Sequence, residues 1–269
     1  MRSWNRSAAR LPPRVERQRP GGRSKIPRCG LVCAGLLAVF LFLCACPFSA
    51  RTSEAVAQNS LLFSEDFEAG LSARWEEQGF PSIARHNVFS LASEPDGNHY
   101  LKVESDRSSS AKGVHLTFAP RQCPHVSWRW RISNTIAAGD LTRKERDDAA
   151  AKFYVVFTGP SFWNPLDKRI LVYLWDHRAP VGAIYPNAWL PDKERMVILE
   201  SGTLKVGQWV DEQVHLANDF TRAFPGEEPG EVEAVAFLAD TDNTRSRVTV
   251  GFDDLTIRCI EPETSRVRR

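Results

Sequence analysis

The feature that most constrains the fold is a run of strict alternation between apolar and polar residues in the middle of the chain. Residues 126–132 read Val-Ser-Trp-Arg-Trp-Arg-Ile, so every second side chain is apolar. Successive side chains of a β-strand point to opposite faces, so this pattern predicts a strand with one buried face. Trp128 and Trp130 lie on the apolar face, and we expect both in the core rather than on a binding surface.

Comparable signals recur along the chain and are separated by clusters of Gly, Pro, Asn and Asp. Segments 100–105, 114–118, 248–252 and 255–260 also alternate, whereas 151–157, 170–175, 196–199 and 232–238 are more continuously apolar, as in strands covered on both faces. Only 216–224 has helical spacing, and Pro225-Gly226 ends it. The sequence therefore predicts a mainly β fold, an antiparallel jelly-roll-like β-sandwich with one short helix.

The N-terminus has the features of an export signal. Nine Arg or Lys residues fall within the first 28 positions and are followed by the apolar stretch 31–46, which is short for a membrane-spanning helix. Ala55-Val56-Ala57 fits a small-x-small cleavage site, so we expect residues 1–57 to be a signal peptide. Two alternatives stay open: a lipoprotein acylated at Cys46, and an uncleaved anchor. We expect residues 58–260 to form one domain and 261–269 a disordered tail.

Removal of residues 1–57 reverses the net charge of the chain. That segment holds ten basic and two acidic residues, which leaves 25 Lys or Arg against 31 Asp or Glu. A mildly acidic domain does not attract phosphate backbones, so we expect no nucleic-acid partner. A membrane would be contacted only through an uncleaved or lipidated N-terminus.

Cysteine usage also indicates export. Four of the six cysteines lie in the targeting segment, and Cys123 and Cys259 remain in the domain. Two cysteines in an exported domain suggest one disulfide between them, with two buried free thiols as the alternative. The expected location is therefore the periplasm or the cell exterior, with or without a lipid anchor.

An ordered series of short motifs spans residues 60–259. It comprises Glu65-Asp66-Phe67-Glu68, Trp128-Arg129-Trp130, 147–157, Tyr173-Leu174-Trp175, Ser201-Gly202, Gly207-Gln208-Trp209, 218–224 and 240–244. This series resembles domain-of-unknown-function family 3047, with departures at Lys152, where Arg is expected, and Phe220, where Tyr is expected. The resemblance implies an exported bacterial β-rich protein and supplies no established activity or site.

The chain ends show a second, looser resemblance, to carbohydrate-binding jelly rolls. Such modules open with an Asp-Phe-Glu segment followed by Trp, here Asp66-Phe67-Glu68 and Trp75, and close with a strand such as Asp253-Asp254-Leu255. The resemblance implies a structural calcium ion where the chain ends meet. We name Asp66, Glu68 and Asp253 the chain-end acids and predict that they are its ligands.

Other acidic residues sit at the ends of predicted strands. Asp147 and Asp148 precede the strand at 151–157, and Asp240 and Asp242 follow the strand at 232–238. Strand ends place side chains at the rim of a sandwich, where binding sites are commonly built. We therefore predict one polar cluster of these four acids, with Arg222 as its counter-charge. Asp240-Thr241-Asp242-Asn243-Thr244 also spaces oxygen ligands like a calcium loop, although a polar turn explains the same residues.

Aromatic and catalytic candidates are less specific. Trp175 is a candidate platform for stacking a sugar, together with the loop residues Trp163 and Trp189. Glu212 joins the strand-end acids as a candidate general acid or base. The sequence contains no Gly-x-Ser-x-Gly, His-Glu-x-x-His or Gly-rich phosphate loop, which argues against zinc and nucleotide cofactors.

Three function classes follow from these observations. The first is an exported module of the envelope or exterior that binds a glycan or a similar polar ligand. The second is a glycan-acting hydrolase or lyase that uses the acidic cluster. The third is a structural envelope protein without a small ligand. The sequence alone does not separate a binding protein from an enzyme.

Overall fold

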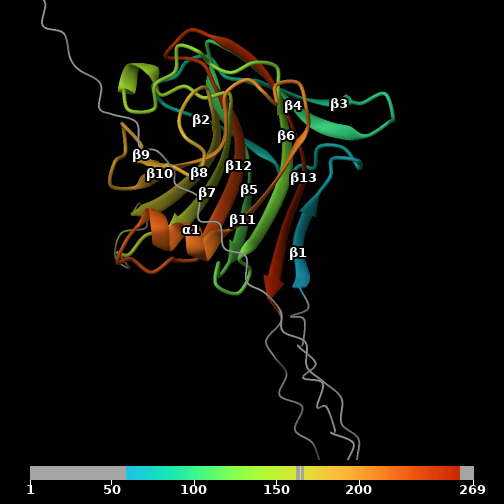
Figure 1. Cartoon of the computed structure of the whole chain (residues 1–269). Helices are drawn as coiled ribbons and strands as arrows, with labels where there is room; N and C mark the ends of the chain where they lie inside the picture. The colour runs from blue at the N-terminus through green and yellow to red at the C-terminus, as the bar shows by residue number, and fades with distance from the viewer. Residues whose placement is uncertain (1–58, 162–163, 165–166, 261–269) are drawn as a thin grey trace, which may run out of the picture. The chain divides into compact units, whose positions relative to one another are not determined.

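The computed structural model describes residues 59–161, 164 and 167–260. The predicted signal segment 1–57, the predicted tail 261–269 and Trp163 lie outside the described residues. Thirteen strands, one α-helix and one short 3-10 helix, η1, make up this part of the chain (Figure 1). In chain order they are β1 (Asn59–Glu65), β2 (Glu76–Gly79), β3 (Val88–Ser93), β4 (His99–Asp106), β5 (Ser109–Phe118), β6 (His125–Ile132), η1 (Lys144–Arg146), β7 (Ala151–Thr158), β8 (Lys168–Asp176), β9 (Ile184–Pro186), β10 (Glu194–Ser201), β11 (Val210–His215), α1 (Leu216–Ala223), β12 (Val232–Asp240) and β13 (Arg247–Ile260).

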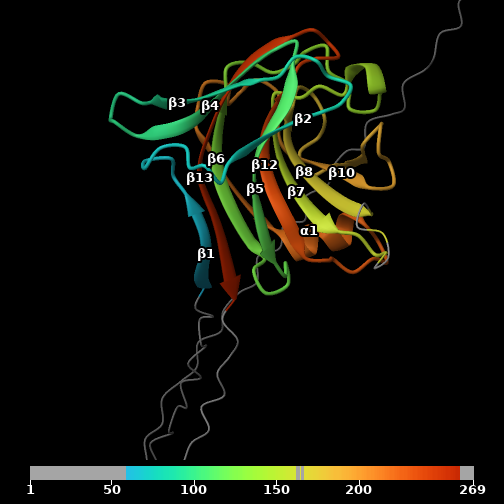
Figure 2. The same ribbon diagram turned by 180° about the vertical axis from the view of Figure 1, so that it is seen from behind.

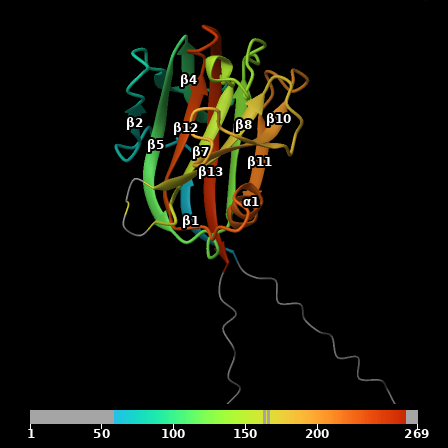
Figure 3. The same cartoon turned by 90° about the vertical axis from the view of Figure 1, so that its left-hand side faces the viewer.

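The strands form two facing sheets, which confirms the predicted β-sandwich (Figure 3). The smaller sheet has the order β11-β6-β13-β4-β3, with β1 paired to β13 in addition. The larger sheet has the order β2-β5-β12-β7-β8-β10-β9. The pair β8 and β10 is parallel, so the prediction of a purely antiparallel fold is wrong at this position. The parallel pairing arises because the chain passes through β9, which pairs antiparallel with β10 at the sheet edge.

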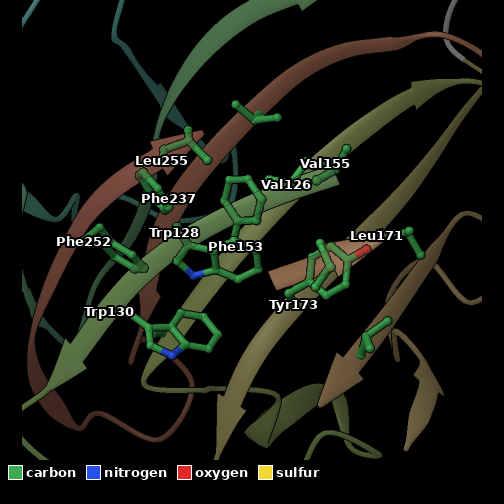
Figure 4. Packing of buried hydrophobic residues seen from close by; sticks show 14 of the residues in the cluster. Val126, Trp128, Trp130, Phe153, Val155, Leu171, Tyr173, Phe237, Phe252 and Leu255 are labelled. Carbon is green, nitrogen blue, oxygen red and sulfur yellow. The ribbon is translucent and has the colours of Figure 1, made fainter. Parts of the chain in front are cut away.

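The alternation in β6 matches its environment. Val126, Trp128, Trp130 and Ile132 are buried, and the residues between them are partly exposed. The two tryptophans pack among aromatic rings from the opposite sheet, with 4.5 Å between the ring centroids of Trp128 and Phe153 (Figure 4). Their burial as core residues is therefore confirmed.

The larger sheet is also covered on its outer face. Val172, Leu174, Met196 and Ile198 form a second buried cluster there, together with Leu141 from the loop that contains η1. This explains why β8 and β10 are apolar without alternation, as strands covered on both faces are.

The last strand ties the described chain together. β1 pairs antiparallel with the second half of β13, so the two ends of the domain lie side by side (Figure 2). Cys123, just before β6, forms a disulfide with Cys259 near the end of β13, as the sequence suggested. Among the described residues, no helix is long and apolar enough to cross a bilayer.

Candidate functional site

The four predicted strand-end acids lie together at one end of two central strands of the larger sheet, β12 and β7. β12 runs antiparallel to β7, with Leu238 opposite Lys152, so the end of β12 meets the start of β7. This pairing brings Asp240 and Asp242 next to Asp147 and Asp148, which immediately precede β7. A single polar cluster of these acids is therefore present.

The loop after β12 is held over Asp148. The Asp148 carboxylate accepts hydrogen bonds from the backbone N–H groups of Asn243, at 3.2 Å, and Thr244, at 2.7 Å. Thr241 points inward, where its hydroxyl lies 2.7 Å from that of Ser105. Because side chains alternate along β12, Asp240 lies on the outer face of the sheet. Asp242, in the turn that follows, has a carboxylate oxygen within 4.8 Å of one from Asp240.

The counter-charge of this cluster is Lys152, not Arg222. The Lys152 ammonium is buried, donates to Asp240 Oδ2 at 2.6 Å and also donates to the Asp147 carbonyl at 3.1 Å. Arg222 lies on α1, at the end of the sandwich opposite η1 (Figures 1 and 3), where it pairs with Asp219 and reaches the Gly182 carbonyl. The prediction of Arg222 as the counter-charge failed because α1 packs near the start of β12, whereas the acids lie at its end.

A cavity of about 570 Å³ opens beside these residues on the outer face of the larger sheet. We call it the acidic pocket. Its lining consists of Phe80, Pro81, Ser82, Ile83, Ser109, Asp147, Lys152, Tyr154, Asn187, Trp189, Leu190, Glu194, Leu238, Asp240, Asp242 and Asn243. Apolar residues come mainly from the loops at 80–83 and 189–190, and charged residues come from the sheet and its strand ends.

Trp189 lies at this pocket and has 55% of its surface exposed. Its loop is fixed by Asn187, whose side-chain oxygen accepts hydrogen bonds from the backbone N–H groups of Trp189 and Leu190. The Lys144 ammonium lies 5.1 Å from the centre of the Trp189 ring. An exposed, positioned indole next to polar groups is the type of surface on which apolar sugar faces pack.

Carboxylates outnumber cations in the acidic pocket. Asp147, Glu194, Asp240 and Asp242 line it together with one ammonium group, that of Lys152. Burial alone would lower the pKa of Lys152, but Asp240, Tyr154 and Asp147 together outweigh burial and hold that pKa well above its usual range. Lys152 is therefore charged at neutral pH and leaves a surplus of acidic groups.

Burial, together with the neighbouring carboxylates, raises the pKa values of the acids. Burial raises the pKa of Glu194 to about 7, and burial together with the neighbouring Asp240 does the same for Asp242. Burial also raises the pKa values of Asp147 and Asp148. Groups with a pKa near neutrality can donate or accept a proton, which is the property that general acids and bases require.

Trp175 and Glu212 lie away from this pocket. Trp175 is fully buried between the sheets and donates its indole N–H to the Gly202 carbonyl at 3.1 Å, so it cannot stack against a ligand. Its position at the end of β8 suggested exposure, but it faces inward in register with Tyr173. Glu212 lies on β11 of the smaller sheet, where its carboxylate accepts a hydrogen bond from the Trp130 indole.

The chain-end acids have partners of their own. Asp253 Oδ2 accepts hydrogen bonds from Arg129, at 2.6 Å, and from the Asn98 side chain, at 2.9 Å. The Glu68 carboxylate accepts one from the backbone N–H of His99 and contacts its ring. Asp66 caps the backbone N–H of Glu68. A calcium ion here would have to displace Arg129 from Asp253, and the predicted ion remains untested.

Several pocket residues were not predicted from the sequence. Glu194 lies two residues before the apolar run 196–199 of β10, and Lys152 lies inside the mostly apolar strand β7. A charged residue within a strand that is covered on both faces costs several kcal/mol of burial free energy unless it is paired. That cost could have identified both residues as candidates for a site.

Comparison with solved structures gives similarities at low identity. The family 11 carbohydrate-binding module of the cellulase Lic26A-Cel5E of Clostridium thermocellum is 9% identical, with a TM-score of 0.40 over 79% of this chain and 100% of the module. The K3 adhesin domain of Lys-gingipain from Porphyromonas gingivalis w83 is 16% identical, with a TM-score of 0.36 over 74% and 99%. The cellulose-induced protein Cip1 is 15% identical, with a TM-score of 0.41 over 72% and 96%. These similarities are too distant to transfer a ligand or an activity.

Sequence comparison is more decisive. No curated protein matches the chain significantly. A family model described as "Protein of unknown function (DUF3047)" matches residues 73–256, which include the acidic pocket and the described strands apart from β1 and the end of β13. The resemblance inferred from the ordered motifs is thereby confirmed, and this chain belongs to the DUF3047 family.

Proposed function

We propose that this protein is an exported binding module that holds a glycan or a similar polar ligand in the acidic pocket. The observation that carries the proposal is an exposed Trp189 beside a row of buried carboxylates in one cavity. A volume of about 570 Å³ falls within the usual range of small-molecule sites. The indole offers an apolar platform, and the carboxylates offer acceptors for hydroxyl groups.

The electrostatics narrow the class of ligand. The pocket has more acceptors than donors and a surplus of negative charge, so it favours a ligand rich in donors. Neutral polyhydroxylated sugars and amino sugars meet this requirement, whereas sulfated or carboxylated sugars would be repelled. The disulfide supports export, since structural disulfides persist in oxidising compartments.

Binding can be tested on an array of neutral, amino-bearing and anionic glycans. We expect retention of neutral or amino-bearing glycans, and about tenfold weaker binding by Trp189→Ala, since an aromatic contact contributes roughly 1–1.5 kcal/mol. Leu204→Ala is the matched control, because Leu204 is 93% exposed and lies outside the pocket. Retention of no glycan, or equal loss in both variants, would count against the proposal.

A second function, glycan hydrolysis or elimination, is favoured by the raised pKa values. Glu194 and Asp242 line the same cavity, and both have a pKa of about 7, suitable for a general acid at neutral pH. Asp148 is a weaker catalytic candidate, because hydrogen bonds from the backbone N–H groups of Asn243 and Thr244 favour its ionised form. Release of reducing ends or unsaturated products from a polysaccharide, lost in Glu194→Gln with binding retained, would establish an enzyme.

A further inference from the structure

Three carboxylates converge beside the acidic pocket, and two of them, Asp240 and Asp242, line it. One oxygen each from Asp148, Asp240 and Asp242 lie within 4.8 Å of one another. Ligand oxygens of one Ca²⁺ ion are separated by at most about 5 Å, twice the usual Ca–O distance, whereas those of Mg²⁺ are closer, at about 4 Å. The three oxygens are therefore close enough to share one Ca²⁺ ion.

Two of these carboxylates have oxygens that the protein leaves without partners. Within the described residues, Asp240 Oδ1 and Asp242 Oδ1 are buried and have no hydrogen-bond partner. Asp240 as a whole is 7% exposed. A buried carboxylate oxygen without a donor is costly, and native structures usually satisfy such groups with water or an ion. Both residues line the pocket, so the buried orphan oxygens lie beside a cavity.

The charge balance points to a cation rather than to a neutral donor. Lys152 satisfies Asp240 Oδ2 and the Asp147 carbonyl, and no hydrogen bond of Lys152 to Asp148 or Asp242 is found among the described residues. Three converging carboxylates therefore share at most one positive charge. A hard divalent ion would balance this surplus, and the open side of the pocket admits the water molecules that complete its coordination shell.

From this juxtaposition we propose that Asp148, Asp240 and Asp242 bind one calcium ion where the end of β12 meets the start of β7. The ion bridges the segment before β7 and the loop after β12, which already meet through hydrogen bonds to Asp148. The inference goes beyond the proposed function, because ion binding requires no sugar and can be measured in its absence. A protein that binds calcium and no glycan would refute the first proposal only.

The test is calorimetric titration of CaCl₂ into the purified protein after removal of metals with a chelator and dialysis. We expect one ion per chain with a dissociation constant on the order of 10⁻⁵ to 10⁻³ M, the range of sensor and extracellular calcium sites, and weaker binding of MgCl₂. Asp242→Asn should weaken calcium binding at least about tenfold, since it replaces a charged ligand. It is the preferred variant because no protein donor holds the buried Asp242 Oδ1.

Asp66→Asn is the matched control, because Asp66 is an exposed acid at the other predicted calcium site. It should leave the titration unchanged. Circular dichroism of each variant excludes misfolding as the cause of a loss, and Asp240→Asn replaces Asp242→Asn if the latter fails to fold. Absence of binding at 5 mM CaCl₂, about five times the weakest expected constant, would overturn the proposal and leave a shared proton between Asp240 and Asp242. Binding that Asp66→Asn abolishes and Asp242→Asn spares would overturn it as well.

Discussion

The chain-end acids and the acidic pocket are both groups of carboxylates, yet they are neutralised in different ways. Asp253 meets Arg129 and Asn98, and Glu68 meets His99, so each carboxylate has its own donor. The acidic pocket places four carboxylates around Lys152 and leaves oxygens of Asp240 and Asp242 without donors. The first arrangement holds the chain ends together, whereas the second retains unsatisfied acceptors that a ligand can use.

The difference lies in charge balance rather than in the number of acids. A carboxylate with a dedicated cation gains little from a second one, because its lone pairs are already occupied. A surplus of buried carboxylates destabilises the protein until a proton, a cation or a polar ligand arrives. Clusters of this second kind are therefore better candidates for function.

The largest expected effect comes from removing the one ammonium group of the acidic pocket. Lys152→Met keeps the length of the buried side chain but leaves Asp240 without its partner, and loss of one member of a buried ion pair costs about 3–5 kcal/mol. Unfolding in urea at pH 7.5 measures this loss of stability. The loss should be smaller at pH 5, where carboxylates of the acidic pocket can take up protons.

Lys152→Arg is the control, since it retains the charge and is the residue that the family resemblance leads one to expect. We expect it to cost less than half as much as Lys152→Met. Equal losses in the two variants would mean that packing, not charge, makes Lys152 necessary.

The second prediction concerns the pH dependence of stability. The pKa of Glu194 is 4.5 in the unfolded chain and about 7 in the folded protein, where burial raises it and Lys152, Asp147 and Asp240 also act on it. Its contribution to stability is therefore complete below pH 4.5 and is lost as the pH rises through 7. The loss is on the order of 3 kcal/mol, because each tenfold difference in proton affinity between the folded and unfolded chain corresponds to about 1.4 kcal/mol.

Glu194→Gln removes this titration. Between pH 4.5 and pH 8, the natural protein should lose stability relative to the variant, by up to the same amount. Urea unfolding of both proteins at each of the two pH values measures this difference in the free energy of unfolding. Asp192→Asn is the control, because Asp192 is an exposed acid outside the pocket. Parallel pH profiles for Glu194→Gln and the natural protein would contradict the raised pKa.

Much of this architecture could be predicted from the sequence, because burial on one face leaves a periodic trace. The alternation of residues 126–132 indicated the inward face of β6, and the helical spacing of 216–224 indicated α1. The parallel direction of β8 and β10 could not be predicted in this way. Strands that are buried on both faces are equally apolar whether they pair parallel or antiparallel.

The pocket was predictable only in part. Asp147 and Asp240 could be assigned to strand ends, but their meeting depends on β7 and β12 being antiparallel neighbours, which no local pattern specifies. For the same reason Arg222 could not be placed at the opposite end of the sandwich. The wrong expectation for Trp175 was avoidable, because it ends the segment 170–175, whose continuous apolarity already indicated a strand covered on both faces.

The third prediction tests the chain-end acids. Arg129→Met removes the cation from Asp253, which is fully buried, but Asn98 and the backbone N–H of Asp254 still donate to that carboxylate. We expect a loss of about 1.5–3 kcal/mol, the usual contribution of a hydrogen bond to a charged group, and thus less than for Lys152→Met. Thermal unfolding of both variants in one buffer measures the difference. A larger loss for Arg129→Met would reverse our ranking of the two sites.

The smallest expected effect distinguishes the two candidate calcium sites by stability alone. An ion that binds only the folded protein stabilises it by about 1.4 kcal/mol at ten times its dissociation constant, which corresponds to a few degrees in the melting temperature of a domain of this size. We expect this shift on addition of CaCl₂ to chelator-treated protein, and its loss in Asp242→Asn. Because Arg129 occupies Asp253, we expect Asp66→Asn to retain the shift. Loss of the shift in Asp66→Asn alone would mean that calcium displaces Arg129 and joins the chain ends, and that the surplus charge of the acidic pocket is balanced by protons.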